Sequence, residues 1–175
     1  MSAGPTISNS ALTGDLTGIL GKHVIYVYAN GWKYELYVRN AETIESRCLM
    51  GPMFGRWSKN QAAKIIQLSD DLYKLAWVEP TGTTTVVIVY LTGRQVHTTI
   101  SYPQWMLDYP EITLTRYEDN LDEIIAARDL GPTYPLTLVS SAGRITYLET
   151  REPEDDSVIA GPPGKLPLGY ADQTN

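Results

Sequence analysis

From residue 22 onward, the chain alternates between short segments rich in Val, Ile, Tyr and Thr and brief clusters of turn-forming residues. This regular spacing is typical of an all-β sandwich or barrel. The turn signals are Asn30-Gly31, Asn40-Ala41, Asp70-Asp71, Pro80-Thr81-Gly82 and Thr92-Gly93. The segments between them predict strands over residues 22–28, 33–39, 43–50, 54–59, 63–68, 72–79, 83–91, 95–102, 111–117 and 144–149.

Residues 120–129 are the one segment whose apolar positions have a clear helical spacing. Asn120 can act as the N-cap with Glu123 three residues later, and Gly131-Pro132 would end the helix. We therefore expect one short helix that covers an end or a flank of the barrel.

The length and the residue composition along the chain indicate a single domain. Its 175 residues can bury a substantial core, and no linker or internal repeat divides them. Residues 1–19 are rich in Ser, Gly, Thr and Ala and are expected to form a flexible arm. Residues 20–151 would form the barrel, and the acidic, Pro- and Gly-rich residues 152–175 an irregular tail.

The hairpin expected around Asn30-Gly31 is the most informative segment, because this turn signal joins two strands that are unusually aromatic. The chain has 12 Tyr against one Phe, and a buried tyrosine needs a partner for its hydroxyl. Tyrosines that converge on one cavity would bind an oxygen-bearing ligand; alternatively, the hairpin is simply a tyrosine-rich sheet face. The aromatic residues of the hairpin are Tyr26, Tyr28, Trp32, Tyr34 and Tyr37.

The register of this hairpin decides where its tyrosines point. A two-residue loop would pair Tyr28 with Lys33 and place Tyr34 on the opposite face from Tyr26 and Tyr28. A type I turn followed by Gly31 in the left-handed region shifts the pairing by one residue and brings the three tyrosines together. The alternation of the second strand favours an inward Tyr34, whereas the first strand is compatible with either face.

Charge and cysteine content exclude several classes of function. The formal net charge of −6 and the isoelectric point near 4.9 argue against a nucleic-acid or anionic-membrane surface. No run of about 18 apolar residues could span a membrane, and the N-terminus lacks the pattern of a signal peptide. The single cysteine, Cys48, cannot form an internal disulfide, which fits a reducing compartment. We expect a cytoplasmic protein.

The sequence contains few of the usual catalytic motifs. His23 and His97 are far apart, and Cys48 belongs to no ligand spacing, so we expect no metal site. The chain also lacks a glycine-rich phosphate loop and a nucleophile elbow. We therefore expect no cofactor.

The chemistry that remains lies in charged residues inside predicted strands. Alternation places Tyr73, Leu75, Trp77 and Glu79 on one face, and if that face is the interior, desolvation would raise the pKa of Glu79 toward the range of a general acid. A buried Arg56 could hold a carboxylate bidentately. The plainer interpretation, which spacing alone favours, is that Glu79 ends a strand at a turn or pairs with Arg56.

Several segments together resemble the phenolic acid decarboxylases of bacteria and fungi. The resemblance covers roughly residues 20 to 150, with the segments in the same order and almost no gaps. The segments are Ile25-Tyr26-Val27-Tyr28-Ala29-Asn30-Gly31-Trp32-Lys33-Tyr34-Glu35, Gly55-Arg56-Trp57, Trp77-Val78-Glu79-Pro80-Thr81-Gly82, Pro103-Gln104-Trp105, Pro110-Glu111-Ile112-Thr113, Thr133-Tyr134-Pro135 and Ile145-Thr146-Tyr147-Leu148.

This resemblance implies a flattened, lipocalin-like antiparallel β-barrel, a homodimer, and a pocket inside the barrel that needs no cofactor. The implied reaction is the loss of CO₂ from 4-hydroxycinnamic acids, such as p-coumaric, ferulic and caffeic acid, to give 4-vinylphenols. The family's functional residues fall on Tyr26, Tyr28, Tyr34, Arg56 and Glu79. The resemblance also places four residues at the pocket wall: Trp77, Thr85, Ile100 and Tyr102.

The implied mechanism uses the substrate itself as the electron sink. Glu79 would protonate the alkene carbon that bears the carboxylate, giving a quinone methide, and loss of CO₂ would restore the ring. Arg56 and Tyr34 would hold the carboxylate, and Tyr26 with Tyr28 the phenolic oxygen. The opposite substrate orientation is equally compatible with the sequence.

The chain departs from the family pattern near the expected site. Residues 48–52, Cys-Leu-Met-Gly-Pro, replace the usual Ile-His-Ser-Gly-Met, and Phe54 stands where a small residue is usual. Ser101-Tyr102 replaces paired aromatics, and Thr85 a typically apolar residue. These changes leave two alternatives open: a barrel that binds small aromatic ligands without turnover, and an enzyme that uses quinone-methide chemistry for another step.

Overall fold

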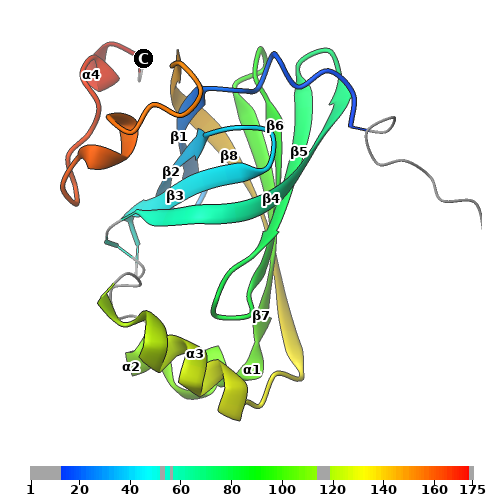
Figure 1. Cartoon of the computed structure of the whole chain (residues 1–175), viewed down its shortest axis with the longest axis vertical. Helices are drawn as coiled ribbons and strands as arrows, with labels where there is room; N and C mark the ends of the chain where they lie inside the picture. Colours follow the sequence, from blue (N-terminus) through cyan, green and yellow to red (C-terminus); the bar gives the residue numbers. More distant parts are fainter. Residues whose placement is uncertain (1–12, 52–53, 56, 114–118, 174–175) are drawn as a thin grey trace, which may run out of the picture.

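The computed structural model describes residues 13–51, 54–55, 57–113 and 119–173. Eight antiparallel strands follow one another around a closed barrel, and the last strand pairs with the first (Figure 1). This confirms the predicted all-β, lipocalin-like antiparallel barrel. The strands are β1 (Lys22–Tyr28), β2 (Lys33–Val38), β3 (Thr43–Met50), β4 (Ser58–Ser69), β5 (Leu72–Val78), β6 (Thr84–Tyr90), β7 (Gln95–Pro103) and β8 (Leu136–Thr150).

Strand β4 corrects one prediction, because residues 54–59 and 63–68 do not form two separate strands. The strand runs without interruption from Ser58 to Ser69, and Phe54 makes only an isolated bridge to Cys48. Asn60, which lies between the two predicted strands, has a positive φ of 53° inside the observed strand, and the pairing with β3 shifts nearby. The region predicted as a break between two strands is therefore a local irregularity inside one strand.

Two predictions near the C-terminal half were also wrong. The strand expected over 111–117 is instead a short helix, α2 (Pro110–Thr113), as far as the described residues reach. Pro110 fits there because the first turn of a helix needs no N–H from it. Strand β8 begins at Leu136 rather than at residue 144, and its first half pairs with β7 beyond the end of β1.

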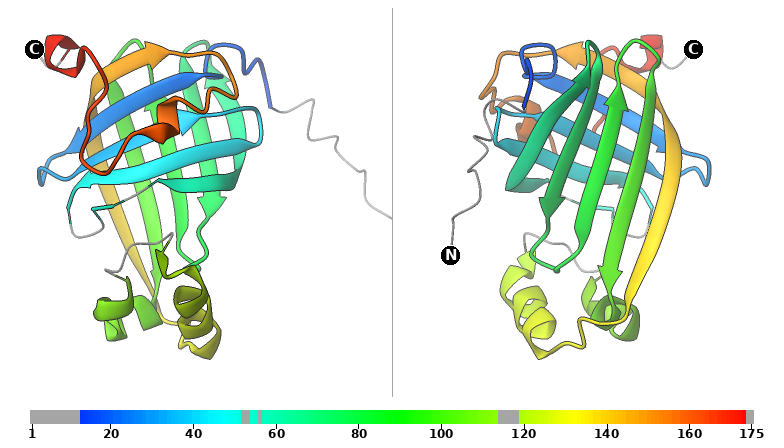
Figure 2. Two further views of the ribbon diagram at one scale, coloured as in Figure 1. Left: turned by 60° about the vertical axis from the view of Figure 1, so that its left-hand side comes forward. Right: turned by 90° about the vertical axis from the view of Figure 1, so that its right-hand side faces the viewer.

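The predicted helix is present as α3 (Leu121–Leu130), but it is not alone. Helices α1 (Gln104–Asp108), α2 and α3 lie together at one end of the barrel (Figure 2). Trp105 and Met106 of α1 pack against Ile124 of α3 in a small apolar cluster. We call this three-helix unit the helical cap. Two further short helices lie in the C-terminal segment, η3 (Val158–Ala160) and α4 (Tyr170–Gln173).

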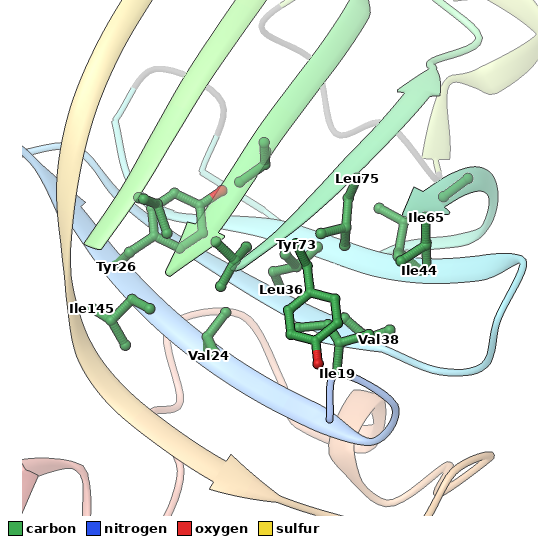
Figure 3. Close-up of a cluster of buried hydrophobic side chains, with 14 of the residues drawn as sticks. Ile19, Val24, Tyr26, Leu36, Val38, Ile44, Ile65, Tyr73, Leu75 and Ile145 are labelled. Carbon is green, nitrogen blue, oxygen red and sulfur yellow. The ribbon is translucent and has the colours of Figure 1, made fainter. Parts of the chain in front are cut away.

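The main core fills one part of the barrel interior, because every second side chain of each strand points inward. Figure 3 shows this cluster, in which Val24, Leu36 and Leu75 are almost completely buried. Ile19 is buried in the same cluster, and Leu16 packs against it. The packed part of the chain thus begins before residue 20, inside the stretch expected to be a flexible arm.

The C-terminal segment after Glu152 is largely irregular and crosses the outer face of β1, β2 and β3 (Figure 2). A buried arginine on β3, Arg47, anchors it. Arg47 donates hydrogen bonds to the carbonyl oxygens of Pro162 and Lys165 at 3.0 and 2.8 Å. Within the described ranges, no helix is long and apolar enough to cross a membrane.

Candidate active site

The first hairpin adopts the second of the two registers that the sequence allowed. Tyr26 lies opposite Tyr34, and the backbone N–H of Tyr28 donates to the carbonyl oxygen of Trp32 at 2.9 Å. The loop therefore has three residues, and Gly31 occupies the left-handed region with φ 84°. This register places the three tyrosines on the same inward face.

The tyrosine rings form a compact triad inside the barrel. The rings of Tyr26 and Tyr34 are stacked with centroids 6.1 Å apart, and Tyr28 meets each of them edge-on at 5.4 and 5.6 Å. Burial raises the pKa of all three phenols above the ordinary value. The triad is therefore neutral near pH 7 and can donate hydrogen bonds to an anionic or phenolic oxygen.

Glu79 directly follows Val78, the last residue of β5, and lies two residues after the inward-facing Trp77. Part of its surface is accessible, although protein atoms surround the carboxyl closely, and this burial raises the pKa of Glu79 to about 7. Thr85 donates a long hydrogen bond of 3.4 Å to Glu79 Oε1, which partly offsets the effect of burial. Near neutral pH, a substantial fraction of Glu79 is therefore protonated and can act as a proton donor.

Trp77 has a buried indole N–H with no hydrogen-bond partner in the described part of the chain. The N–H is close enough to Glu79 to lower the pKa of the carboxyl, but it does not meet the geometry of a hydrogen bond. A buried donor without a partner is costly, so it marks a place where a bound polar group would be stabilised.

One cavity joins the tyrosine triad to Glu79. The triad and Cys48 come from β1–β3, whereas Glu79 and its neighbours come from the other half of the barrel, at and after β5. Cross-strand pairing aligns Trp77, Thr85 and Ile100 in one row of the inner face. The lining residues are Tyr26, Tyr28, Tyr34, Ser46, Arg47, Cys48, Gly55, Ser58, Trp77, Glu79, Thr83, Thr85, Thr98, Ile100, Tyr102 and Met106.

The structure brings together every predicted site residue that it describes. Arg56 lies outside the described residues, and its neighbour Gly55 lines the cavity. Phe54 does not line it: the ring is exposed and faces Gly164 of the C-terminal segment. Residues 48–52 differ from the family pattern, and of those that the structure describes, Cys48 lines the cavity.

Sequence reasoning missed Thr98 and Met106. Thr98 accepts a hydrogen bond of 2.6 Å from the Tyr28 hydroxyl and is buried. The inward alternation of β7, which also contains Ile100 and Tyr102, was the available signal. Met106 belongs to α1, whose position depends on contacts between distant parts of the chain. No group of three or more potential metal ligands occurs among the residues that the structure describes.

Fold and cavity together define a class: small antiparallel barrels that hold one titrating carboxyl opposite a group of phenols. Comparison with known proteins identifies the family. A family model described as "Phenolic acid decarboxylase (PAD)" matches residues 16–173, and the chain belongs to this family. It is therefore a decarboxylase, a carboxy-lyase that acts on a phenolic acid.

Two relatives are similar over most of their length. A protein of Vibrio cholerae named "Probable phenolic acid decarboxylase" is 39% identical over 156 residues, which are 89% of this chain and 90% of the relative. The phenolic acid decarboxylase PadC of Bacillus subtilis is 34% identical over 148 residues, which are 85% of this chain and 92% of the relative.

Proposed function

We propose that this protein converts 4-hydroxycinnamic acids, such as p-coumaric, ferulic and caffeic acid, to 4-vinylphenols and CO₂ without a cofactor. The observation that carries the proposal is Glu79, a carboxyl with a pKa of about 7 in the same cavity as three neutral tyrosines. A proton donor and a set of phenol-binding groups are what this reaction needs from the protein.

The reaction proceeds in two balanced steps. First, after the phenolic proton has passed to water, the ionised para-oxygen pushes electrons through the ring, and the alkene carbon that bears the carboxylate takes the proton of Glu79. The product of this step is a quinone methide. Second, the bond to CO₂ breaks, its electrons restore the aromatic ring, and the para-oxygen is again a phenolate. The phenolate leaves with a proton from water, and Glu79 is reprotonated from solvent.

The tyrosine triad supports one assignment of roles. Tyr26 and Tyr28 bind the phenolic oxygen, and to donate to it Tyr28 redirects the one hydroxyl proton that it otherwise gives to Thr98. Tyr34 and Arg56 hold the substrate carboxylate. In the reversed orientation, Tyr26 and Tyr28 hold the carboxylate instead, and Glu79 remains the acid in both.

A spectrophotometric assay without added cofactor tests the proposal. The purified protein is mixed with p-coumaric, ferulic or caffeic acid, and the product is identified. We expect vinylphenols from these acids and no reaction of cinnamic acid, which lacks the para-hydroxyl. Efficient decarboxylation of cinnamic acid would contradict the quinone-methide mechanism. Binding of all three phenolic acids without turnover would instead support the alternative of a binding barrel.

Glu79→Ala tests the acid itself. We expect it to lower kcat by roughly 10²- to 10⁴-fold while the substrate still binds, because the tyrosine triad is untouched. Retention of most activity would remove Glu79 from this role.

We also propose a homodimer, on the basis of an outer sheet face on which two large apolar side chains are exposed beside small polar ones. Val78, Thr84, Ser101 and Leu138 lie side by side across β5–β8 and point outward. Val78 is 65% exposed and Leu138 69%, and such a patch on a sheet favours association. Light scattering after gel filtration tests this directly, with Leu138→Lys as the variant expected to be monomeric. A cytoplasmic location remains a prediction from sequence that cell fractionation can test.

A further inference from the structure

The loop that carries Glu79 lies outside the regular strands. Strand β5 ends at Val78 and β6 begins at Thr84. Two backbone hydrogen bonds of 2.8 Å close the loop, from Glu79 N–H to the Thr83 carbonyl oxygen and from Gly82 N–H to the Glu79 carbonyl oxygen. These bonds set the shape of the loop, but they do not connect its outer residues, Pro80 and Thr81, to the barrel wall.

The helical cap supplies that connection through two side chains. Trp105 of α1 is completely buried, and its indole N–H donates to the Thr81 carbonyl oxygen at 2.9 Å. Arg128 of α3 donates from Nη1 to the Pro80 carbonyl oxygen at 3.1 Å. Two consecutive carbonyl groups, directly after the acid, are therefore held from outside the barrel.

Packing reinforces these two bonds. Gly82 has a φ of 83°, and a Cβ at this position would lie 3.6 Å from the Arg128 side chain, so the arginine stem covers the loop. On the cavity side, the Thr83 hydroxyl donates to Met106 Sδ at 2.9 Å. The cap is itself anchored, since the Trp105 backbone N–H donates to the Pro132 carbonyl oxygen at 2.8 Å. The loop is thus held between α1, α3 and the end of β7.

We propose that Trp105 and Arg128 are positioning residues for catalysis, which hold the Glu79 loop so that the carboxyl points into the cavity. The proposal rests on the proposed function, in which Glu79 is the proton donor. Neither residue lines the cavity, and both act through the backbone that carries the acid. A small displacement of this backbone would move the carboxyl relative to the substrate carbon, and catalysis is sensitive to such displacements.

The test uses variants that remove each hydrogen bond and keep part of the side-chain packing. Trp105→Phe removes the indole N–H, and Arg128→Met keeps the stem that covers Gly82. We expect each to lower kcat roughly threefold to tenfold, the effect of one lost hydrogen bond. KM should change by less than about twofold, because the groups that contact substrate are unchanged. Arg128→Lys, which can still donate to Pro80, should recover most of the activity.

Asp129→Asn is the matched control. Asp129 forms a salt bridge of 2.8 Å with Arg128 on an exposed surface, and neither of its described polar contacts reaches the loop. Its replacement perturbs the same arginine without removing the bond to Pro80, so kcat should stay within about twofold of the wild type. A kcat loss in this variant as large as in Arg128→Met would contradict a specific role of the bond to Pro80.

A second readout does not depend on activity. The carboxyl carbons of ¹³C-labelled glutamates are followed by NMR across a pH titration, and Glu79 is assigned with Glu79→Gln. Among the described residues, Tyr102 interacts electrostatically with Glu79, and burial raises the pKa of Tyr102 to about 12, so it stays neutral in this range. A loosened loop would let water reach Glu79, so its midpoint should move toward lower pH in Trp105→Phe and Arg128→Met.

The two readouts separate the failure of this inference from the failure of the proposed function. If both variants are folded and both the kcat and the Glu79 midpoint equal those of the wild type, the positioning role is wrong. If the wild-type protein releases no CO₂ but the Glu79 midpoint shifts in the variants, the proposed substrate class is wrong and the positioning of Glu79 by the cap is supported.

Discussion

At the scale of the residue, the environment of Glu79 matters most. Burial raises its pKa from an ordinary 4.5 to about 7, with Thr85 as a hydroxyl donor that partly opposes the shift. A raised pKa means that the folded protein binds this proton more tightly than the unfolded chain does. The same burial that makes Glu79 a suitable acid therefore destabilises the fold once the carboxyl is ionised.

Because the ionised carboxyl destabilises the fold, Glu79→Gln should be more stable than the wild type at high pH, by an amount that depends on pH. The Glu79 proton stabilises the wild-type fold below about pH 4.5, and this contribution is lost as the pH rises through about 7. The variant cannot ionise, so relative to the wild type its free energy of unfolding should increase by about 1–3 kcal/mol between roughly pH 5 and pH 8. Urea titrations at both pH values measure it. A difference that is independent of pH would show that the carboxyl does not titrate as described.

At the scale of the element, the position of the tyrosine triad depends on how β1 meets β8. Gly143 lies opposite Tyr28 in that pairing. A Cβ at Gly143 would lie 2.9 Å from Val96 Cγ2, 3.0 Å from the Val27 carbonyl oxygen and 3.1 Å from Tyr28 Cδ1. The glycine therefore provides the space in which the Tyr28 ring turns toward Thr98.

Gly143→Ala should move this ring and weaken substrate binding. The close contact with backbone leaves little room to relax, so we expect a loss of about 1–3 kcal/mol in stability and a rise in KM. Gly161→Ala is the matched control: nothing lies within 4 Å of its ideal Cβ, and its φ of −70° suits alanine. Thermal melts of both variants measure the loss of stability, and initial rates measure the change in KM. Equal behaviour of the two would mean that Gly143 is not needed for the triad.

The sequence predicted those elements whose signals are local. Strands β1, β2 and β3 and helix α3 follow from alternation, turn residues and a helix stop, and the triad follows from the Gly31 register that the sequence left open. The length of β4 and β8 could not be predicted from local signals. Both strands include residues that otherwise favour turns, and pairing with neighbouring strands keeps these residues extended. The catalytic assignment of Glu79 came from resemblance, since spacing alone favoured the plainer interpretation.

At the scale of the whole molecule, a buried ionic cluster joins the barrel to its C-terminal segment. Glu35, only 1% exposed, accepts a hydrogen bond of 2.5 Å from Arg47 Nε, and its other oxygen lies 2.6 Å from His23 Nε2. His23 Nδ1 lies 2.8 Å from Glu149. Arg47 also stacks on Trp57, with its guanidinium carbon 4.7 Å from the ring centroid. These contacts hold residues 161–165 against β1–β3.

Loss of Arg47 should therefore destabilise the whole domain. In Arg47→Met, Glu35 stays buried with one cationic partner fewer, and removing one member of a buried pair costs about 3–5 kcal/mol. Arg151→Met is the control, because Arg151 pairs with Asp155 in a partly exposed position and should contribute less than about 1 kcal/mol. Urea unfolding measures the free energy of unfolding of Arg47→Met and Arg151→Met. Similar small losses in both variants would mean that the cluster does not anchor the C-terminal segment.

Transfer of a proton from Glu79 to the alkene carbon that bears the carboxylate is the central claim, and isotope incorporation with and without the Glu79 carboxyl tests it most directly. The protein is incubated with p-coumaric acid in D₂O, where the Glu79 carboxyl carries deuterium, and the 4-vinylphenol is analysed by ¹H NMR. We predict one deuterium on the terminal vinyl carbon and no incorporation by Glu79→Gln, which should form no product. Vinylphenol without deuterium at that carbon, or normal incorporation by Glu79→Gln, would contradict the account.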